Sequence, residues 1–439
     1  MTPVPFQTAA TSAVVTGLAP LHALGDRFSS PLPLIAYLAG ACAAVVASIV
    51  IALRRDPHAS QRHALGAASA AAPRPLPRGV ERLFGAAGLL GWIWIGAVLL
   101  FGGSEGERVD DLLLWVIGWV GIAYLSLFHP DVWAAIDPNR RIAHLLRRLL
   151  RRAVPDGAAP PRRFDGRAVG PAALFGVVAI IWLELVATGG GGGAILLYAH
   201  LLLALWVITG RLGASDPDAW AAANDPLTAW FSMIGALRLR GVAWGASGAI
   251  LTSVAVGSVI FDGLSQGQLF FDLFGVPAAP ERTLLLLAWL AAIALLAAIT
   301  MRLAAGRAWP TALGEGLLPV AAGYLIAHYA SWVLIAGQRI VIAISDPLQQ
   351  GSDYFGTAWY EPTGAFIPGA AVWGLQLAAV IGGHVLGVSR GHAAVLASRR
   401  ADGASRRKLL LAQIPLALFV LALTLVTLWS LGQVVVAAE

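Results

Sequence analysis

The stretch TLLLLAWLAAIALLAAITM, residues 283–301, decides the fold class. It contains no charged residue, and as a helix at about 1.5 Å per residue it is about 28 Å long, close to the roughly 30 Å of a bilayer's hydrocarbon core. A segment inside hydrocarbon must satisfy its own backbone hydrogen bonds, which favours an α-helix. Similar uncharged runs recur along the chain. The sequence therefore predicts several membrane-spanning helices.

Composition supports this prediction and excludes a soluble core. Of the 439 residues, 58% are hydrophobic and 12% are charged, and the mean hydropathy is +0.74. Ordinary soluble domains have about 45–50% apolar and about 25% charged residues. The lone cysteine, Cys42, excludes an intrachain disulfide and any paired-cysteine metal or redox site. The expected class is an all-α, polytopic transmembrane helical bundle.

Uncharged runs bounded by charges or by Gly and Pro predict about ten spans. Residues 1–32 are expected to form an outer N-terminal segment, and residues 33–439 a single multi-pass membrane domain. The predicted spans are 33–53, 83–102, 111–128, 168–187, 194–210, 242–260, 283–301, 313–336, 368–388 and 409–430.

The distribution of basic residues predicts the orientation. All of the 30 Lys and Arg residues except Arg27, Arg108, Arg282 and Arg339 fall in alternate loops, which marks those loops as cytoplasmic. Both termini are therefore expected outside. Orientation also accounts for the net charge of +6, so nucleic-acid binding is not expected. A chain rich in Ala, Gly, Leu and Arg with a single lysine, Lys408, is typical of a GC-rich bacterial genome and indicates a bacterial inner membrane.

The loop 129–167 is the most organised of the predicted inner segments. In residues 144–152, leucines fall on one helical face and arginines on the other, which predicts a helix lying on the anionic inner leaflet. Docking of a partner protein is the alternative. Upstream, Trp133 is expected at the membrane interface. The arginines of this amphipathic segment are Arg147, Arg148, Arg151 and Arg152.

Ionisable side chains within spans are candidates for function, because each costs roughly 2.5–3.5 kcal/mol on insertion scales. Counting from the outer helix ends places Glu184, His200 and His328 at a similar depth in the outer half of the bundle. His384 lies nearer the cytoplasmic side and ranks second. The competing interpretations are an interhelical hydrogen bond for each histidine and a reach to the interface for Glu184.

Outer loops add acids to this layer. Gly263 and Gly267 are expected to permit a sharp turn that aims Asp262 back into the bundle. Asp346 and Asp353 lie in a Gly- and Ser-containing loop that is expected to fold over an outer cavity. Turn formation is the alternative role for the two loop aspartates. Carboxylates and imidazoles at one depth suit a divalent metal such as Zn, Mn or Co. The metal ligands expected on this basis are Glu184, His200, His328 and Asp262.

Several blocks of the chain match one pattern in order. They are His22–Pro33, Val259–Gly263 with Ser265 and Gly267, Ala327–Tyr329, Gln338, Ser345–Pro347, Gly351–Thr357, Gly383–Val385 and His392. These blocks resemble one bacterial family, the membrane-associated fenitrothion hydrolases, and the resemblance covers nearly the whole chain. It implies hydrolysis of an organophosphorus triester such as fenitrothion to a nitrophenol and a dialkyl (thio)phosphate, together with a second membrane subunit.

Such a substrate is apolar and partitions into lipid, so we expect an outer pocket lined by aromatic residues. Water attack would use a general base or a metal-bound water, with Asp262, His328, Asp346 and Asp353 as the expected catalytic residues. Two other classes compete: a transporter or channel for a small solute or ion, with His328, Glu184 and Asp262 as relay sites, and a non-catalytic scaffold subunit. The expected substrate-binding aromatics are Tyr329, Trp332, Tyr354 and Phe355.

Overall fold

The computed structural model describes residues 75–103, 108–150, 164–187, 193–239, 241–366 and 368–431, and some residues between 35 and 50. Every regular element in these parts is a helix, which confirms the all-α class. The predicted N-terminal segment 1–32 and most of the first predicted span lie outside the described residues.

The chain first forms a group of mostly short helices. Their order is α3 (Arg78–Phe101), α4 (Val109–Asp111), the π-helix η1 (Leu112–Gly121), α5 (Ile122–Phe128), α6 (Val132–Ile136), α7 (Pro138–Leu149), α8 (Pro171–Trp182), the π-helix η2 (Leu183–Ala187), α9 (Gly193–Gly213), α10 (Pro217–Asn224), α11 (Pro226–Gly235) and the 3₁₀ helix η3 (Ala236–Arg238).

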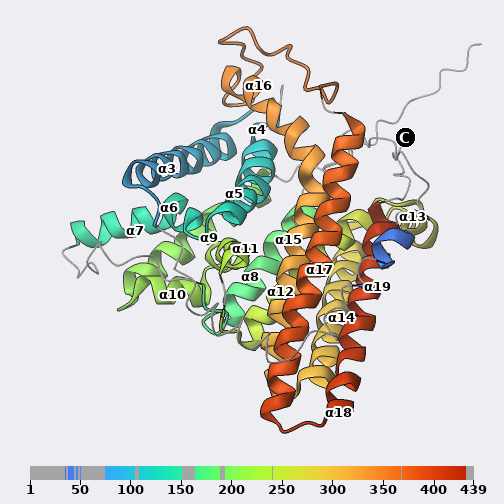
Figure 1. Ribbon diagram of the computed structural model, residues 1–439. Helices are drawn as coiled ribbons and strands as arrows, with labels where there is room; N and C mark the ends of the chain where they lie inside the picture. The colour runs from blue at the N-terminus through green and yellow to red at the C-terminus, as the bar shows by residue number, and fades with distance from the viewer. Residues whose placement is uncertain are drawn as a thin grey trace, which may run out of the picture.

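A second group contains the longest helices. It comprises α12 (Ala246–Ser265), α13 (Gln268–Phe274), α14 (Ala279–Ala305), η4 (Gly306–Ala308), α15 (Trp309–Ala336), η5 (Gly337–Arg339), α16 (Ile340–Ser345), α17 (Gly369–Ala401), α18 (Arg406–Leu411) and α19 (Gln413–Leu431). In Figure 1, α12, α14, α15, α17 and α19 lie side by side as a bundle, and the shorter helices pack against one side of it. The α16 end and the α18 end are opposite ends of this bundle.

Seven helical stretches of the described chain are long and apolar enough to cross a membrane. One of them, Ala279–Ser345, contains both α14 and α15, and the apolar stretch Pro171–Ala187 is shorter than the rest. These stretches indicate a multi-pass membrane protein.

Glycines allow α15 and α17 to cross closely. A Cβ added to Gly387 would meet the carbonyl oxygen of Gly316, and one added to Gly383 would lie 2.7 Å from the carbonyl oxygen of Pro319. Gly383, Gly387 and Gly391 are spaced four residues apart, so they face the same side of α17. Small residues at this spacing let membrane helices approach and pack through their backbones. The side chains of α15 and α17 that lie beside this seam are therefore brought into contact.

Helix α12 corrects part of the expected turn. The helix continues to Ser265, beyond the predicted end at residue 260, so Gly263 lies inside it, and the chain turns at Gln266 and Gly267 instead. A Cβ at Gly263 would lie 2.5 Å from Ser430 Oγ, so glycine is needed here for close packing against α19. Asp262 therefore reaches the bundle interior from a helix, where its side chain is 2% exposed.

The amphipathic segment also differs from expectation. Arg147 is buried and donates to the carbonyl oxygens of Arg211 and Ala214, each at 2.9 Å, at the end of α9, whereas Arg148 is exposed. A guanidinium bound to the last carbonyls of a helix satisfies acceptors that have no partner within that helix. The expected lipid-facing role is thus wrong for Arg147, while Arg151 and Arg152 lie outside the described residues.

Trp133, expected at the interface, is buried. Its Nε1 donates to Thr228 Oγ1 at 3.0 Å, and its ring lies 4.7 Å from that of Phe231. Trp133 therefore belongs to the core formed by apolar residues of α6 and α11. The turn pattern around it in the sequence does not reveal this position.

Candidate functional site

Asp262 and His328 form a buried pair between α12 and α15. His328 Nε2 lies 2.8 Å from Asp262 Oδ2, and the two side chains are 6% and 2% exposed. The two residues were expected to lie together, and the structure brings them into direct contact.

Two more side chains complete a group that we call the Asp262 cluster: Glu184, Asp262, His328 and Tyr329. The Tyr329 hydroxyl lies 3.4 Å from Asp262 Oδ2 and 3.5 Å from Glu184 Oε1. The hydroxyl has a single hydrogen, so it donates to only one of the two carboxylates at a time. Glu184 is buried in the π-helix η2, an irregularity often found at functional sites.

Asp262 contacts both Gln266 and His328. Gln266 Nε2 donates to Asp262 Oδ1 at 2.8 Å, and an ionised carboxylate only accepts. With Asp262 ionised, Nε2 of His328 is the donor to Asp262 Oδ2, and Nδ1 of a neutral ring is an acceptor. A histidine oriented by a carboxylate in this way has the arrangement of a general base.

His328 also lines a small cavity. Its volume is about 10 Å³, near the least that holds one water molecule. Imidazole and hydroxyl groups on its wall supply the polar partners that a buried water needs. The lining residues are Val259, Ile260, Tyr324, Ala327, His328, Thr427 and Ser430.

A second histidine lies beyond the same cavity. His384 is fully buried on α17, and its Nε2 is 3.3 Å from the hydroxyl of Tyr324, which lines the cavity. Its Nδ1 lies 2.8 Å from the carbonyl oxygen of Val380. Counting depth along one helix separated His384 from the other candidates. The Gly-mediated crossing of α15 and α17 brings it to Tyr324, which its position along one helix does not reveal.

Three of the expected metal ligands, Glu184, Asp262 and His328, lie in the Asp262 cluster. The fourth, His200 on α9, packs against Trp92 at a ring distance of 5.3 Å. Within the described ranges, no group of three or more His, Cys, Asp or Glu residues is arranged to hold a metal ion.

The two loop aspartates organise their own loop. Asp346 accepts hydrogen bonds from the backbone N–H groups of Gln350 and Gly351, both at 2.9 Å. Asp353 accepts from Ser345 Oγ at 2.7 Å and from the Ala358 N–H at 3.0 Å, and these bonds hold the pKa of its carboxyl below the ordinary value. Such contacts are typical of turn-forming aspartates.

The four expected aromatic residues divide into two pairs. Tyr329 and Trp332 are buried with their rings 5.7 Å apart, next to the Asp262 cluster. Tyr354 and Phe355 lie in the loop after α16 and are each 69% exposed. The aromatic residues therefore do not line one common pocket.

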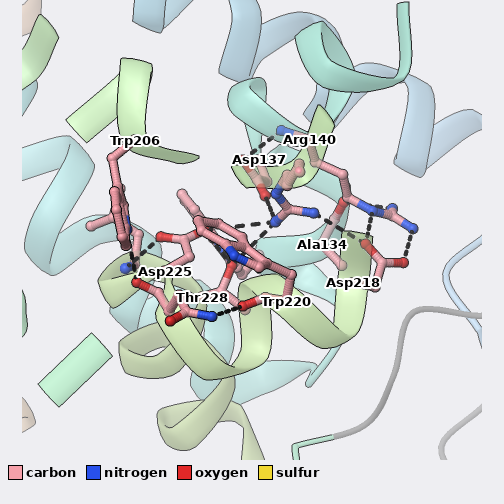
Figure 2. Close-up of polar contacts among 12 residues, drawn as sticks. Ala134, Asp137, Arg140, Trp206, Asp218, Trp220, Asp225 and Thr228 are labelled. Carbon is pink, nitrogen blue, oxygen red and sulfur yellow. Dashed lines mark hydrogen bonds and ion pairs between the residues drawn. The ribbon is translucent and has the colours of Figure 1, made fainter. Parts of the chain in front are cut away.

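A second buried polar group, which we call the Arg211 network, comprises Arg140, Arg211, Asp137, Asp218 and Asp225. Arg211 is 2% exposed and lies 2.7 Å from Asp137, 3.1 Å from Asp218 and 3.6 Å from Asp225. Arg140 makes two hydrogen bonds to Asp218, at 3.2 and 3.1 Å. Figure 2 shows these contacts converging from several helices.

Within this network the pKa values of two aspartates shift in opposite directions. Burial, together with nearby Asp137, raises the pKa of Asp225 to about 6, even though Arg211 opposes the change. Burial acts the same way on Asp218, but its bonds to Arg140 and the charge of Arg211 outweigh it and hold the pKa of Asp218 below its ordinary value. No local sequence pattern indicates this network, since its members come from separate turns and helix ends.

Comparison of the chain with family models, with curated proteins and with solved structures gives no match.

Proposed function

We propose that this chain is a membrane-embedded hydrolase, or a subunit of one, in which His328 is the general base. The 2.8 Å contact between His328 Nε2 and Asp262 Oδ2, beside a cavity with room for a water molecule, carries this proposal. Asp262 orients the ring and stabilises the imidazolium that forms when Nδ1 takes a proton. A general base placed in this way contributes typically about 10²–10⁴-fold in rate.

The proposed substrate is an organophosphorus triester such as fenitrothion, which follows from the sequence resemblance. A water proton passes to His328 Nδ1 as the water oxygen bonds to phosphorus. The bond from phosphorus to the aryl oxygen then breaks, and nitrophenolate leaves with its electron pair. The other product is a dialkyl (thio)phosphate.

A second membrane subunit is part of this proposal. Pockets for ligands of drug size measure about 300–1,000 Å³, whereas the cavity beside His328 measures about 10 Å³. We propose that this cavity holds the attacking water and that the apolar substrate binds where the second subunit meets the lipid-embedded bundle.

A divalent metal remains an alternative source of activated water, with Glu184, Asp262, His328 and His200 as the ligands expected from sequence. If a metal acts, a strong chelator abolishes hydrolysis, and Zn, Mn or Co restores it. If the His328–Asp262 pair acts without a metal, the chelator leaves the rate unchanged.

We further propose about ten spans in a bacterial inner membrane, with both termini outside, from the distribution of arginines. A periplasmic reporter fused after Glu439 should be active, and one inserted at Gly157 should be silent. The reverse pattern would overturn this orientation.

Transport of a small solute or ion is the second candidate. This function is favoured by the buried contact between Tyr324 and His384, because it places further polar groups beyond the cavity. Membranes containing the chain alone, or with its second subunit, should be assayed for nitrophenol release and for solute uptake. Release that depends on His328 supports the hydrolase, and uptake without release supports transport. If neither release nor uptake is found, the result supports a scaffold subunit.

A further inference from the structure

We propose that Arg282, in the first turn of α14, binds a phosphodiester monoanion. Two sources supply this chemistry: the headgroup of a phospholipid, and the dialkyl (thio)phosphate that the proposed hydrolysis releases. Only the second source rests on the proposed function. The site itself rests on the contacts of Arg282 and requires no reaction.

The guanidinium of Arg282 lacks an anionic partner within the chain. Its Nη2 donates to Ser265 Oγ, a neutral acceptor, at 3.3 Å. Among the described residues, no acceptor pairs with its buried Nε and no carboxylate forms an ion pair with it. By contrast, Arg108, which is also expected on the outer side, pairs with Asp110 at 2.9 Å and with Asp111 at 3.5 Å. Because a charge removed from water needs an opposite charge and hydrogen bonds, Arg282 favours an anion from outside the chain.

Arg282 is not placed to stabilise its own helix. Helix α14 begins at Ala279, so the guanidinium belongs to the first turn, where the helix dipole disfavours a cation. The favourable residue of this turn is Glu281, whose carboxylate accepts a hydrogen bond from the backbone N–H of Ala278 at 3.1 Å. The position of Arg282 therefore calls for another explanation than helix stability.

Hydrogen bonds fix the first turn of α14 beside the Asp262 cluster. Ser265, which accepts from Arg282, donates to the carbonyl oxygen of Asp262 at 3.2 Å. Thr283 Oγ1 accepts from Trp182 Nε1 at 2.8 Å, and Trp182 is the last residue of α8, directly before the π-helix of the cluster. An anion bound to Arg282 would therefore lie next to the proposed reaction site.

The first turn of α14 also marks an end of a membrane span. Arg282 directly precedes the uncharged run 283–301, which belongs to an apolar stretch long enough to cross a membrane. Charged and amphipathic side chains at such an end lie at the level of the lipid headgroups. Arg282 is partly exposed, so an anion from this layer has access to it.

The charge and the shape of the site favour a phosphodiester monoanion. A guanidinium presents parallel N–H donors that match two oxygens of a phosphate group. One negative charge neutralises the single positive charge of Arg282. The charge of Asp262 also acts on Arg282 and repels further negative charge, so a dianionic phosphate monoester is disfavoured. Phospholipids and dialkyl (thio)phosphates both carry the favoured monoanion.

The test measures binding of diethyl phosphate to the full chain in dodecyl maltoside, an uncharged detergent, by isothermal titration calorimetry. At about pH 8 the comparison ligand, ethyl phosphate, is mainly a dianion. We expect saturable binding of diethyl phosphate and weaker binding of ethyl phosphate. Arg282→Gln should weaken diethyl phosphate binding by about 10–100-fold, as expected for loss of a hydrogen-bonded charge. Arg302→Gln is the matched control, because Arg302 is exposed in the last turn of the same helix.

A second variant guards against misfolding of Arg282→Gln. Arg282→Lys keeps the charge but loses the paired donors, so its affinity should fall between those of the wild type and Arg282→Gln. A wild type without saturable binding would overturn the site, and so would a folded Arg282 variant that binds as tightly as the wild type.

Competition distinguishes the two sources of the anion. Phosphatidylglycerol in the micelles and diethyl thiophosphate in solution are each titrated against bound diethyl phosphate. Displacement at the lower concentration by the lipid identifies a headgroup site, and displacement at the lower concentration by the thiophosphate identifies a product site. Nitrophenol release from the same wild-type preparation tests the proposed reaction separately. Binding without release removes only the hydrolysis, and release without binding removes only the anion site.

Discussion

The Arg211 network and the Asp262 cluster are both made of buried carboxylates, but their partners differ in kind. In the network, Arg211 and Arg140 hold the acids, and a guanidinium keeps its charge at every pH that a folded protein survives. In the cluster, Asp262 contacts a histidine and a tyrosine, both of which can exchange a proton. Buried acids alone therefore do not mark a reactive site, because the partner of each acid decides whether the pair can exchange a proton.

The largest effect should come from removing titration in the cluster. His328→Gln or Asp262→Asn keeps a hydrogen-bonding side chain but removes the base or the carboxylate that orients it. We expect hydrolysis per folded molecule to fall by about 10²–10⁴-fold, measured as nitrophenol release. Tyr198→Phe is the control and should retain near wild-type activity, since Tyr198 is 65% exposed on α9. A loss below about threefold in both cluster variants would remove His328 as the general base.

Part of the Asp262 cluster could be predicted from the sequence. The pairing of Asp262 with His328 could be predicted, because ionisable groups are rare in spans and these two lie near the same end of their helices. The geometry of this pair could not be predicted, because α12 was expected to end at residue 260 with a turn at Gly263. The helix instead continues, since Gly263 lets α12 pack against Ser430.

Other features depended on contacts between distant segments. His384 reaches Tyr324 because glycines set the crossing of α15 and α17, and helix spacing alone does not reveal which helices pair. Arg147 was expected on the lipid-facing side of its helix, yet the nearby end of α9 offers it carbonyl acceptors. Most of the long helices were predictable, whereas the partners of Arg147 and His384 were not.

The next largest effect is expected in the Arg211 network. Arg211→Met leaves Asp137 and Asp225 buried without their guanidinium, and breaking a buried pair from one side costs about 3–5 kcal/mol. We expect this loss in the free energy of unfolding, measured in detergent. The rate of hydrolysis per molecule that remains folded should not change. Arg140→Met should cost less, because Arg211 still contacts Asp218. A rate loss in folded Arg211→Met would show that the network takes part in the reaction.

The pH dependence of stability should separate the two aspartates of the network. Asp225 has a folded pKa of about 6, above the usual 3.8, so the folded state binds more protons than the unfolded state between these values. Its contribution is therefore present at low pH and is lost as pH rises through this window. The folded pKa of Asp218 is lowered, so its contribution is instead lost as pH falls below 3.8.

Asp225→Asn removes the first of these effects. Because asparagine does not titrate, the stability of the variant relative to wild type should rise by up to about 3 kcal/mol from pH 4 to pH 6.5. Chemical unfolding at a series of pH values measures the difference. A constant difference across this range would show that the pKa of Asp225 is not raised in the folded protein.

The smallest expected effect compares two adjacent arginines of α7. Arg147→Gln removes the donor to the carbonyls of Arg211 and Ala214 and should cost about 1–2 kcal/mol, since some of these partly buried acceptors can regain water. Arg148 is exposed, so Arg148→Gln should change stability by no more than about 0.5 kcal/mol. It should, however, weaken contact with anionic lipid by about 1 kcal/mol. Unfolding in detergent, compared with binding of the loop to anionic vesicles, separates the two roles. If both variants lose only lipid binding, Arg147 acts as a membrane contact and the helix-capping role is wrong.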